Sequence, residues 1–185
     1  MNRRTILAGL GAAFARPATA FAQASKTFAL EPQYLPQSVV YTAAYEIGTV
    51  VVDTKARFLY LIEAPGAARR YGIGVGMAGL AWSGIADVAR KAKWPAWRPT
   101  ANMIKRNPGR YAKYAGGLPG GPGNPLGSRA LYLYRDGKDT MYRIHGTTEP
   151  WTIGRAVSNG CIRMVNEHVE DLYERVPIGA KVVVQ

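Results

Sequence analysis

The chain contains very little cysteine, histidine or acid. Its 185 residues include a single cysteine, Cys161, so no disulfide can form within the chain. The two histidines are His145 and His168, and a Cys/His zinc site would need carboxylates to complete it. Acids number 12 against 24 lysines and arginines, which gives a net charge of +12. The lone thiol has few structural uses, and a nucleophile, a redox switch and a small buried hydrophobe remain open as its role.

Long apolar runs are also missing. Residues 6–15 are apolar, but this run is well short of the roughly 20 residues that a membrane-spanning helix needs, and it ends at Arg16. The basic pair Arg3 and Arg4 precedes it and small residues follow it, which is typical of an export signal. We therefore expect residues 1–24 to be a signal peptide, with the paired arginines favouring the twin-arginine route to the periplasm.

The mature protein stays strongly basic. Removal of residues 1–24 takes away three arginines and no acid, so the net charge falls from +12 to +9. Cationic proteins often bind nucleic acid, but an exported protein rarely meets any, and no RNA-binding motif is visible. We therefore expect an anionic polymer outside the cytoplasm as partner and no nucleic acid. The remaining length, about 160 residues, suits one domain, which we expect to be monomeric and without a membrane span.

Short β-rich runs predict a mostly β domain. These runs are residues 49–53, 57–62, 69–76, 130–145 and 180–185. The first two lie on either side of a short turn, which predicts a hairpin. The fourth contains Asp136-Gly137, a dipeptide that strongly favours the tight turn of a second hairpin.

One segment has helical spacing. Residues 166–176 place their apolar side chains on one face, with Asn166 as the expected N-cap. His168 falls on the opposite side of this helix, so we expect it to be a solvated surface residue. Residues 25–47, rich in Pro, Gln, Ala and Tyr, predict an irregular lead-in, which leaves residues 48–185 as the folded domain.

A long segment without a clear period occupies residues 77–129. Loops of this length are uncommon in compact domains unless they are lids, binding loops or disordered, and its three tryptophans argue against disorder. It contains eight lysines and arginines and no acid between Arg90 and Lys113. A charge run alone is most simply a solvated surface, whereas beside an active site it would attract carboxylates. We expect a loop that covers a cleft.

The chemistry of the cysteine depends on a neighbouring base. A thiol with a pKa of about 8.5 is mostly protonated at neutral pH, so a nucleophilic cysteine needs a base or a positive neighbour. His145 ends a predicted strand beside Gly146, where a side chain can stand out at a sheet edge. The peptide nitrogens of Gly160 and Cys161 are expected to converge on one oxyanion. A Cys/His pair by itself is a weak signal, since a histidine at a strand end is more often structural.

The residues around this pair resemble the signature of the YkuD, or ErfK-like, family of L,D-transpeptidases. From His145 to Tyr173 the chain reads HGTTEPWTIGRAVSNGCIRMVNEHVEDLY, with a histidine in HGT, an Ile-Gly spacer, Ser-x-Gly-Cys-Ile-Arg and a short helix. The upstream stretches PAWRPT, GNPLGSRALYL and VVDTKARFLYLI extend the match over nearly all of the mature chain. The resemblance implies a β-rich, sandwich-like or barrel-like domain with one or two short helices, a deep cleft, and no metal or organic cofactor.

The resemblance also implies a cysteine acyltransferase. Cys161 would attack the carbonyl of the third, diamino acid residue of a peptidoglycan tetrapeptide stem, release D-alanine and become a thioester, and a carbapenem would acylate the same thiol. His145 matches the family's general acid and base, with its ring oriented by the carbonyl of Gly146. An amine of a second stem would then form a crosslink in the cell wall. A lysine of an outer-membrane protein or water are the alternative acceptors.

Three further residues match positions of the family motifs. Arg163 is expected to bind a substrate carboxylate or brace the catalytic loop, and a salt bridge near the helix start is an equal alternative. Trp97 and Asn124 are expected to shape the cleft, with packing and turn formation as alternatives.

The chain departs from the family pattern at two positions. Asn159 stands where many relatives have a histidine, and Gly146 stands where many have a serine. Because the resemblance assigns the base to the upstream histidine, Asn159 is expected to support the site by hydrogen bonding, as is Ser158.

Two other classes of protein remain as competing hypotheses. A non-catalytic wall-binding module would keep the fold and use the basic segment for adhesion, although the presence of both Cys161 and His145 counts against it. A redox sensor is disfavoured because the chain offers no resolving cysteine.

Overall fold

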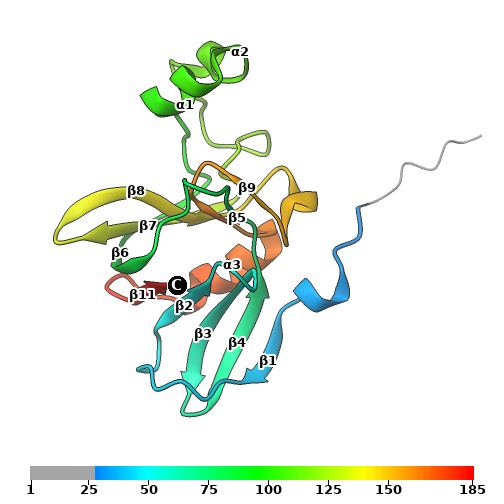
Figure 1. Ribbon diagram of the computed structural model, residues 1–185, viewed down its shortest axis with the longest axis vertical. Coiled ribbons are helices and arrows are strands. Elements are labelled where there is room, and N and C mark those ends of the chain that lie inside the picture. Colours follow the sequence, from blue (N-terminus) through cyan, green and yellow to red (C-terminus); the bar gives the residue numbers. More distant parts are fainter. Residues whose placement is uncertain (1–27) are drawn as a thin grey trace, which may run out of the picture.

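The structure is a computed structural model that describes residues 28–185, so the expected signal peptide lies outside the described residues. The described part is mostly β, as predicted (Figure 1). Its strands are β1 (Gln37–Val40), β2 (Val50–Asp53), β3 (Phe58–Ala64), β4 (Ala67–Gly72), β5 (Val75–Gly76), β6 (Gly84–Lys93), β7 (Arg129–Arg135), β8 (Lys138–His145), β9 (Ala156–Ser158), β10 (Ile162–Arg163) and β11 (Lys181–Val184). Its helices are α1 (Ala101–Arg106), α2 (Pro108–Tyr111) and α3 (Asn166–Arg175), with 3-10 turns η1 (Pro32–Tyr34), η2 (Ala112–Tyr114) and η3 (Pro150–Thr152).

One large mixed sheet carries the fold. Its strand order is β1-β4-β3-β2-β11-β6-β7-β8-β10, with β2 parallel to β11 and β8 parallel to β10, while β5 and β9 form a separate parallel pair. Both predicted hairpins are confirmed, because β2 pairs with β3 and β7 with β8 in antiparallel register. The β7–β8 turn places Asp136 at φ 50° and Gly137 at φ 72°, the left-handed region that this kind of tight turn requires. The last predicted strand is β11.

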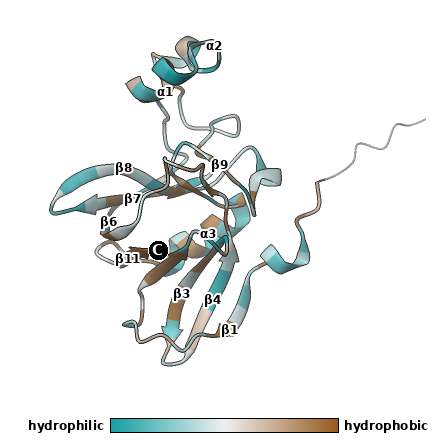
Figure 2. Cartoon of the chain, in the orientation of Figure 1, coloured by the Kyte–Doolittle hydropathy of each residue, from teal (hydrophilic) through white to brown (hydrophobic). Residues whose placement is uncertain are grey.

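Helix α3 packs against the inner face of this sheet. Val169 and Leu172 of the helix are fully buried among side chains such as Tyr71, Leu133 and Ile144. Figure 2 shows the strands around α3 as the most hydrophobic part of the chain, in brown. Burial of this apolar surface is the main favourable term in folding. No helix within residues 28–185 is both long enough and apolar enough to cross a membrane.

The sequence pattern missed four strands, the longest being β6, together with the edge strand β1 and the short β9 and β10. Residues 84–93, predicted to belong to a long loop, form β6 and lie between β11 and β7 in the sheet. Their apolar positions are small or isolated, since only Ala86 and Val88 are buried, and charged residues fill the end of the strand. The prediction of an irregular lead-in is also wrong for residues 37–40, because β1 pairs with β4 at the sheet edge.

Within the rest of the long segment, residues 101–114 form a small helical projection, which we call the helical arm (Figure 1). Thr100 caps α1 by accepting the Met103 N–H at 3.2 Å, and Asn107 caps α2 by accepting the Arg110 N–H at 3.0 Å. These are ordinary N-caps, and Pro108 suits the first turn of α2. The helices escaped prediction because they are too short to show an apolar period.

Two expectations for α3 are wrong. Asn166 is the first residue of the helix rather than its N-cap, which is Val165, and its side chain bonds to other segments. His168 is 8% exposed rather than solvated. Phe28 and Leu30 of the N-terminal segment line a cavity together with His168, so distant chain lies near this side of the helix, which a helical pattern cannot reveal. Burial lowers the pKa of His168.

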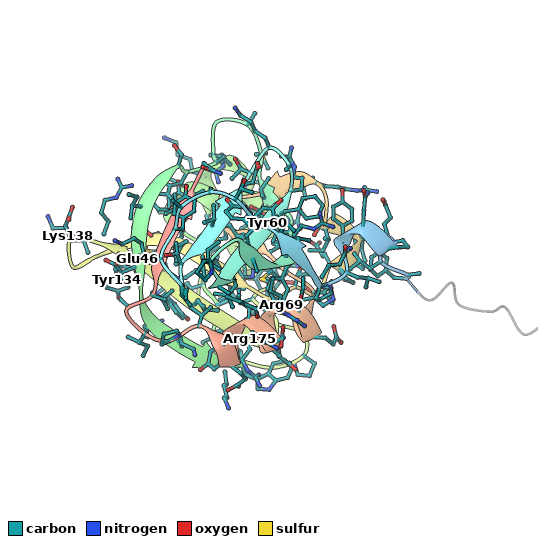
Figure 3. All side chains as sticks on the ribbon, turned by 90° about the horizontal axis from the view of Figure 1, so that it is seen from below. Glu46, Tyr60, Arg69, Tyr134, Lys138 and Arg175 are labelled. Atoms are coloured by element: carbon teal, nitrogen blue, oxygen red, sulfur yellow. The ribbon has the colours of Figure 1, made fainter. Side chains whose placement is uncertain are left out.

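A charged cluster ties α3 to β4. The hydroxyl of the fully buried Tyr71 donates to Asp171 at 2.7 Å, and Arg69 and Arg175 both bond the same carboxylate at 2.8 Å. Figure 3 shows these two arginines next to each other. Partial burial would raise the pKa of Asp171, but the bonds from Tyr71 and Arg175 and the nearby charges lower it overall.

We predict that Tyr71→Phe lowers the free energy of unfolding by about 2 kcal/mol at neutral pH, because it removes a hydrogen bond to a charged group from a buried side chain. The pKa of Asp171 is lowered in the folded state, so the stabilisation is complete above the ordinary carboxyl pKa of about 3.9 and is lost as the pH falls through the folded value. Urea unfolding of both proteins across this range measures the difference. A cost that is the same in acid would contradict the role of the ionised carboxylate.

Candidate active site

The cysteine sits in a short, tightly braced loop between β9 and β10, residues 158–161, which we call the cysteine loop. The hydroxyl of the buried Ser158 donates to the Cys161 carbonyl at 2.6 Å and accepts the Gly160 N–H at 3.1 Å. Gly160 has φ 122°, and a Cβ there would lie 2.7 Å from the Tyr142 ring. Only glycine fits this position without strain. The loop therefore holds the thiol in one place.

This bracing changes the expected oxyanion site. The Gly160 N–H is already paired with Ser158, so it does not converge with the Cys161 N–H on a common oxygen. Ser158 thus supports the backbone of the loop. The Cys161 N–H is the remaining donor of the pair.

His145 is held at the end of β8. The residue is 5% exposed, and its Nδ1 lies 2.5 Å from the carbonyl oxygen of Gly146. A carbonyl oxygen can only accept, so Nδ1 carries the proton and Nε2 is left as an acceptor. The structure thus places the Gly146 carbonyl where the resemblance implies a ring-orienting group.

Strand pairing brings the two reactive residues to one cavity. β10 runs parallel to β8, with Arg163 opposite His145, and Cys161 immediately precedes β10. Both Cys161 and His145 line a cavity of about 440 Å³. The thiol also lies 3.8 Å from the carbonyl oxygen of Met141, a residue in the left-handed region at φ 63°. Such strain in a non-glycine residue is frequent at functional sites.

Burial keeps both groups neutral at rest. It lowers the pKa of His145 to about 4, and the positive charges of Arg163 and Arg143 act in the same direction against the bond to Gly146. Burial also raises the pKa of the Cys161 thiol, although the same two arginines oppose that shift. The resting pair is therefore a thiol beside a neutral imidazole, rather than a thiolate and an imidazolium.

Arg163 forms a salt bridge inside the cavity. Its Nη1 lies 2.7 Å from Glu149, whose other carboxylate oxygen is 3.3 Å from Arg110 of the helical arm. Of the alternatives that the sequence left open, a salt bridge is thus present, and its partner comes from the loop after β8. Glu149 and Arg110 line the same cavity. Arg110 belongs to the basic run noted in the sequence, whereas Glu149, the acid of the HGTTEPW stretch, was not singled out.

The two expected cleft residues differ in position. Trp97 lines the 440 Å³ cavity and a second one of about 370 Å³, and its ring packs against Tyr111 and Tyr114 of the helical arm. Asn124 is 2% exposed and bonds to the backbone of Leu118, Pro119 and Leu126, so it holds the chain returning from the arm. Asn124 is therefore a turn-forming residue here.

Asn166 joins three segments behind the histidine. Its Oδ1 accepts the N–H groups of Ser128 and Thr147, each at 3.2 Å. A Cβ at Gly146 or Gly127 would collide with this oxygen. The backbone at Gly127 and Gly146 thus approaches α3 closely. Any side chain at these two positions would prevent that approach.

No cluster of three or more His, Cys, Asp or Glu side chains that could hold a metal is present within residues 28–185.

A sequence model of the YkuD L,D-transpeptidase catalytic domain matches residues 47–184. The chain belongs to this family. A curated relative, the probable L,D-transpeptidase ErfK/SrfK of Escherichia coli strain K12, is 33% identical over 152 residues, which are 80% of this chain and 47% of that protein. The chain thus spans about half the length of that relative.

Solved structures agree with the family assignment in fold. An L,D-transpeptidase mutant from Enterococcus faecium has a TM-score of 0.54 at 16% identity, covering 76% of this chain and 50% of that one. A protein from Brucella melitensis named as a probable carnitine operon oxidoreductase has a TM-score of 0.58 at 54% identity, covering 84% of this chain and 96% of that one. The oxidoreductase name describes the Brucella protein and is not transferred to this chain. The family assignment rests on the match over residues 47–184.

For this L,D-transpeptidase family member we predict that alkylation of Cys161 by iodoacetamide accelerates continuously with pH through the neutral range. Burial raises the pKa of the thiol, and His145, with a pKa of about 4, is already neutral there, so no imidazolium forms a thiolate pair. Mass spectrometry of the folded protein gives the rates, and the urea-unfolded protein serves as the control. An alkylation rate that stays constant across neutral pH is typical of an activated thiolate. It would contradict a resting state with a Cys161 thiol and a neutral His145 imidazole.

We also predict that Gly146→Ser, which introduces the side chain of many family members, lowers the free energy of unfolding by about 2 kcal/mol through overpacking. The added Cβ would collide with Asn166 Oδ1. In an Asn166→Ala background the same change should cost less, because the colliding atom is gone. Urea unfolding of the four proteins forms a double-mutant cycle, and equal costs in both backgrounds would contradict this explanation.

Proposed function

We propose that the protein is a peptidoglycan L,D-transpeptidase that uses Cys161 as nucleophile. The observation that carries this proposal is the buried His145, with Nδ1 bonded to the Gly146 carbonyl, in the same cavity as the lone cysteine of a YkuD-family chain. The substrate is the tetrapeptide stem of peptidoglycan. The acceptor is an amine of a second stem, so that the product is a crosslink in the cell wall.

In the first half of the reaction, Nε2 of His145 takes the thiol proton as Sγ of Cys161 attacks the carbonyl carbon of the third stem residue. The carbonyl oxygen becomes an oxyanion that accepts a hydrogen bond from the Cys161 N–H. The bond to D-alanine then breaks, and the imidazolium returns its proton to the leaving amine. The enzyme is left as a thioester and the imidazole is neutral again.

In the second half, a neutral amine attacks the thioester carbonyl and gives its proton to Nε2 of His145. The carbon–sulfur bond breaks, and the thiolate regains a proton from the imidazolium. The neutral resting state suits this sequence, since the imidazole must start as an acceptor in both halves. Water in place of the amine would give a carboxypeptidase, and a lysine of an outer-membrane protein would give an anchored protein.

The basic surroundings fit a substrate rich in carboxylates. Arg163, Arg110 and Lys113 all line the cavity that holds Cys161. Glu149 lines the same cavity, but these cations outnumber it, and an excess of one sign of charge raises the local concentration of ligands of the opposite sign. We propose that the protein acts as a monomer in the periplasm after export through the twin-arginine route and removal of residues 1–24, with no nucleic acid partner and no cofactor.

We predict that the protein forms a covalent adduct with a carbapenem, and with a disaccharide tetrapeptide it releases D-alanine. A strained β-lactam amide acylates a nucleophilic thiol in the same way as a stem peptide. Intact-mass spectrometry detects the adduct, which should vanish in Cys161→Ala and form at least about a hundredfold more slowly in His145→Ala, as general-base catalysis contributes roughly 10²–10⁴.

The alternative of a non-catalytic wall-binding module predicts a different result. Folded wild-type protein would then show neither adduct nor D-alanine release, while Cys161→Ala would retain binding to peptidoglycan. Detection of a crosslinked dimer, rather than a trimmed stem, identifies the amine as acceptor.

A further inference from the structure

The side chain of Asn159 connects the cysteine loop with the helical arm. Its Oδ1 accepts a hydrogen bond from Nη2 of Arg106, the last residue of α1, at 2.8 Å. Its Nδ2 donates to the hydroxyl of Tyr111, the last residue of α2, at 2.9 Å. Both ends of one amide are thus used, and within residues 28–185 these are the hydrogen bonds that join the two helices to the cysteine loop.

The two ends of this link differ in rigidity. On the cysteine side, Ser158 and the constrained Gly160 hold the loop, so Asn159 has a fixed position two residues before the nucleophile. On the other side, the arm is hydrophilic and projects from the sheet, as Figures 1 and 2 show. Backbone pairing supports the arm at its base, where Trp97 and Leu118 exchange hydrogen bonds of 2.9 and 2.7 Å. The link therefore sets where the tip of the arm lies relative to the thiol.

The link also lies between two cavities that meet at the nucleophile. Asn159 and Cys161 line both cavities. Tyr111 lines only the 440 Å³ cavity, which contains His145, whereas Arg106 lines only the 370 Å³ cavity, which contains Tyr142 and Arg143. The hydrogen-bonded side chains of Arg106, Asn159 and Tyr111 thus run from one cavity to the other, and Cys161 also lines both.

We propose that Asn159 is a positioning residue that latches the helical arm over the cleft and thereby favours transfer of the acyl group to an amine over its hydrolysis. This proposal rests on the proposed function. A thioester at Cys161 lies where both cavities meet, and the latched arm limits the access of water from the side not filled by substrate. Exclusion of water is a general use of such closed elements in acyl transfer.

The arm has a second, weaker tie that leaves Asn159 as the deciding contact. Arg110 reaches Glu149 at 3.3 Å, but the arginine is 57% exposed and the carboxylate is shared with Arg163, and an ion pair so open to solvent contributes little. The Arg106–Asn159 bond is shorter, and the same amide also bonds the Tyr111 hydroxyl, so Asn159 ties both helices of the arm. Loss of the Asn159 amide removes two bonds at once and leaves the arm attached mainly at its base.

The test is the partition of the acyl-enzyme at a fixed concentration of acceptor amine. Asn159→Ala should raise the ratio of hydrolysed to crosslinked product by about five- to tenfold, the change expected for one to two hydrogen bonds. The rate of acylation by a carbapenem should change by less than about threefold. Arg106→Gln and Tyr111→Phe, which each remove one of the two bonds, should shift the ratio in the same direction by smaller factors.

Lys105→Gln is the matched control. It removes the same charge from the residue next to Arg106, but Lys105 lines neither cavity and makes none of the bonds to Asn159. Its product ratio should equal that of the wild type. An equal shift in this variant would assign the effect to charge on the arm and overturn the latch, as would normal acylation of Asn159→Ala with an unchanged ratio.

Hydrogen exchange of the free protein tests the latch without acyl transfer. The backbone amides of residues 101–111 should exchange about fivefold faster in Asn159→Ala than in the wild type, because local opening becomes easier when tertiary bonds are lost. Unchanged exchange would overturn the latch even if the enzyme is active. Faster exchange in a protein that forms no acyl-enzyme would support the latch and reject the proposed function, so the two failures are distinguishable.

Discussion

The carboxamide of Asn166 is the contact on which the geometry of the site depends. A single oxygen accepts the backbone N–H groups of Ser128 and Thr147, and Gly127 and Gly146 have no side chain that would hold the backbone away from it. This brings the start of β7 and the end of β8 against the first turn of α3. The Gly146 carbonyl that orients the His145 ring belongs to the same stretch of backbone that Asn166 holds. Hydrophobic packing fixes α3 against the sheet, and Asn166 on α3 in turn fixes the backbone that positions the imidazole.

Electrostatics in the cleft follow from the same packing. The imidazole and the thiol lie in a region buried enough to keep both neutral, although Arg143 and Arg163 stand nearby. Arginines cannot give up their charge, so they bias the pair against an imidazolium while supporting an anion at the thiol. Glu149 offsets part of this positive charge by pairing with Arg163. The positive surroundings thus stabilise negative charge that forms only during the reaction, above all the oxyanion of the substrate carbonyl.

Sequence reasoning recovered the parts of the fold with strong local signals. The hairpin at Asp136-Gly137 has a turn that demands left-handed backbone, and α3 has an apolar stripe. It failed for β6, whose neighbours in the sheet come from distant parts of the chain, and for His168, which is buried although it falls opposite the apolar stripe of α3. Cys161 and His145 were identified by motif. The contacts of Asn166 with the backbone of Ser128 and Thr147, and of Glu149 with Arg163, were not identified, because they join segments whose approach no local pattern predicts.

The two departures from the family pattern are each matched by a local partner in this chain. Where many relatives have a serine, Gly146 faces an Asn166 oxygen that leaves no room for a Cβ. Where many have a histidine, Asn159 presents an acceptor to Arg106 and a donor to Tyr111 at the same time. A neutral histidine also has one donor and one acceptor, but its ring holds them at a fixed separation, and protonation would turn the acceptor toward Arg106 into a donor. An amide keeps both its donor and its acceptor at every pH. The hydrogen bonds from Asn159 to the basic arm therefore do not depend on the protonation of the side chain at position 159.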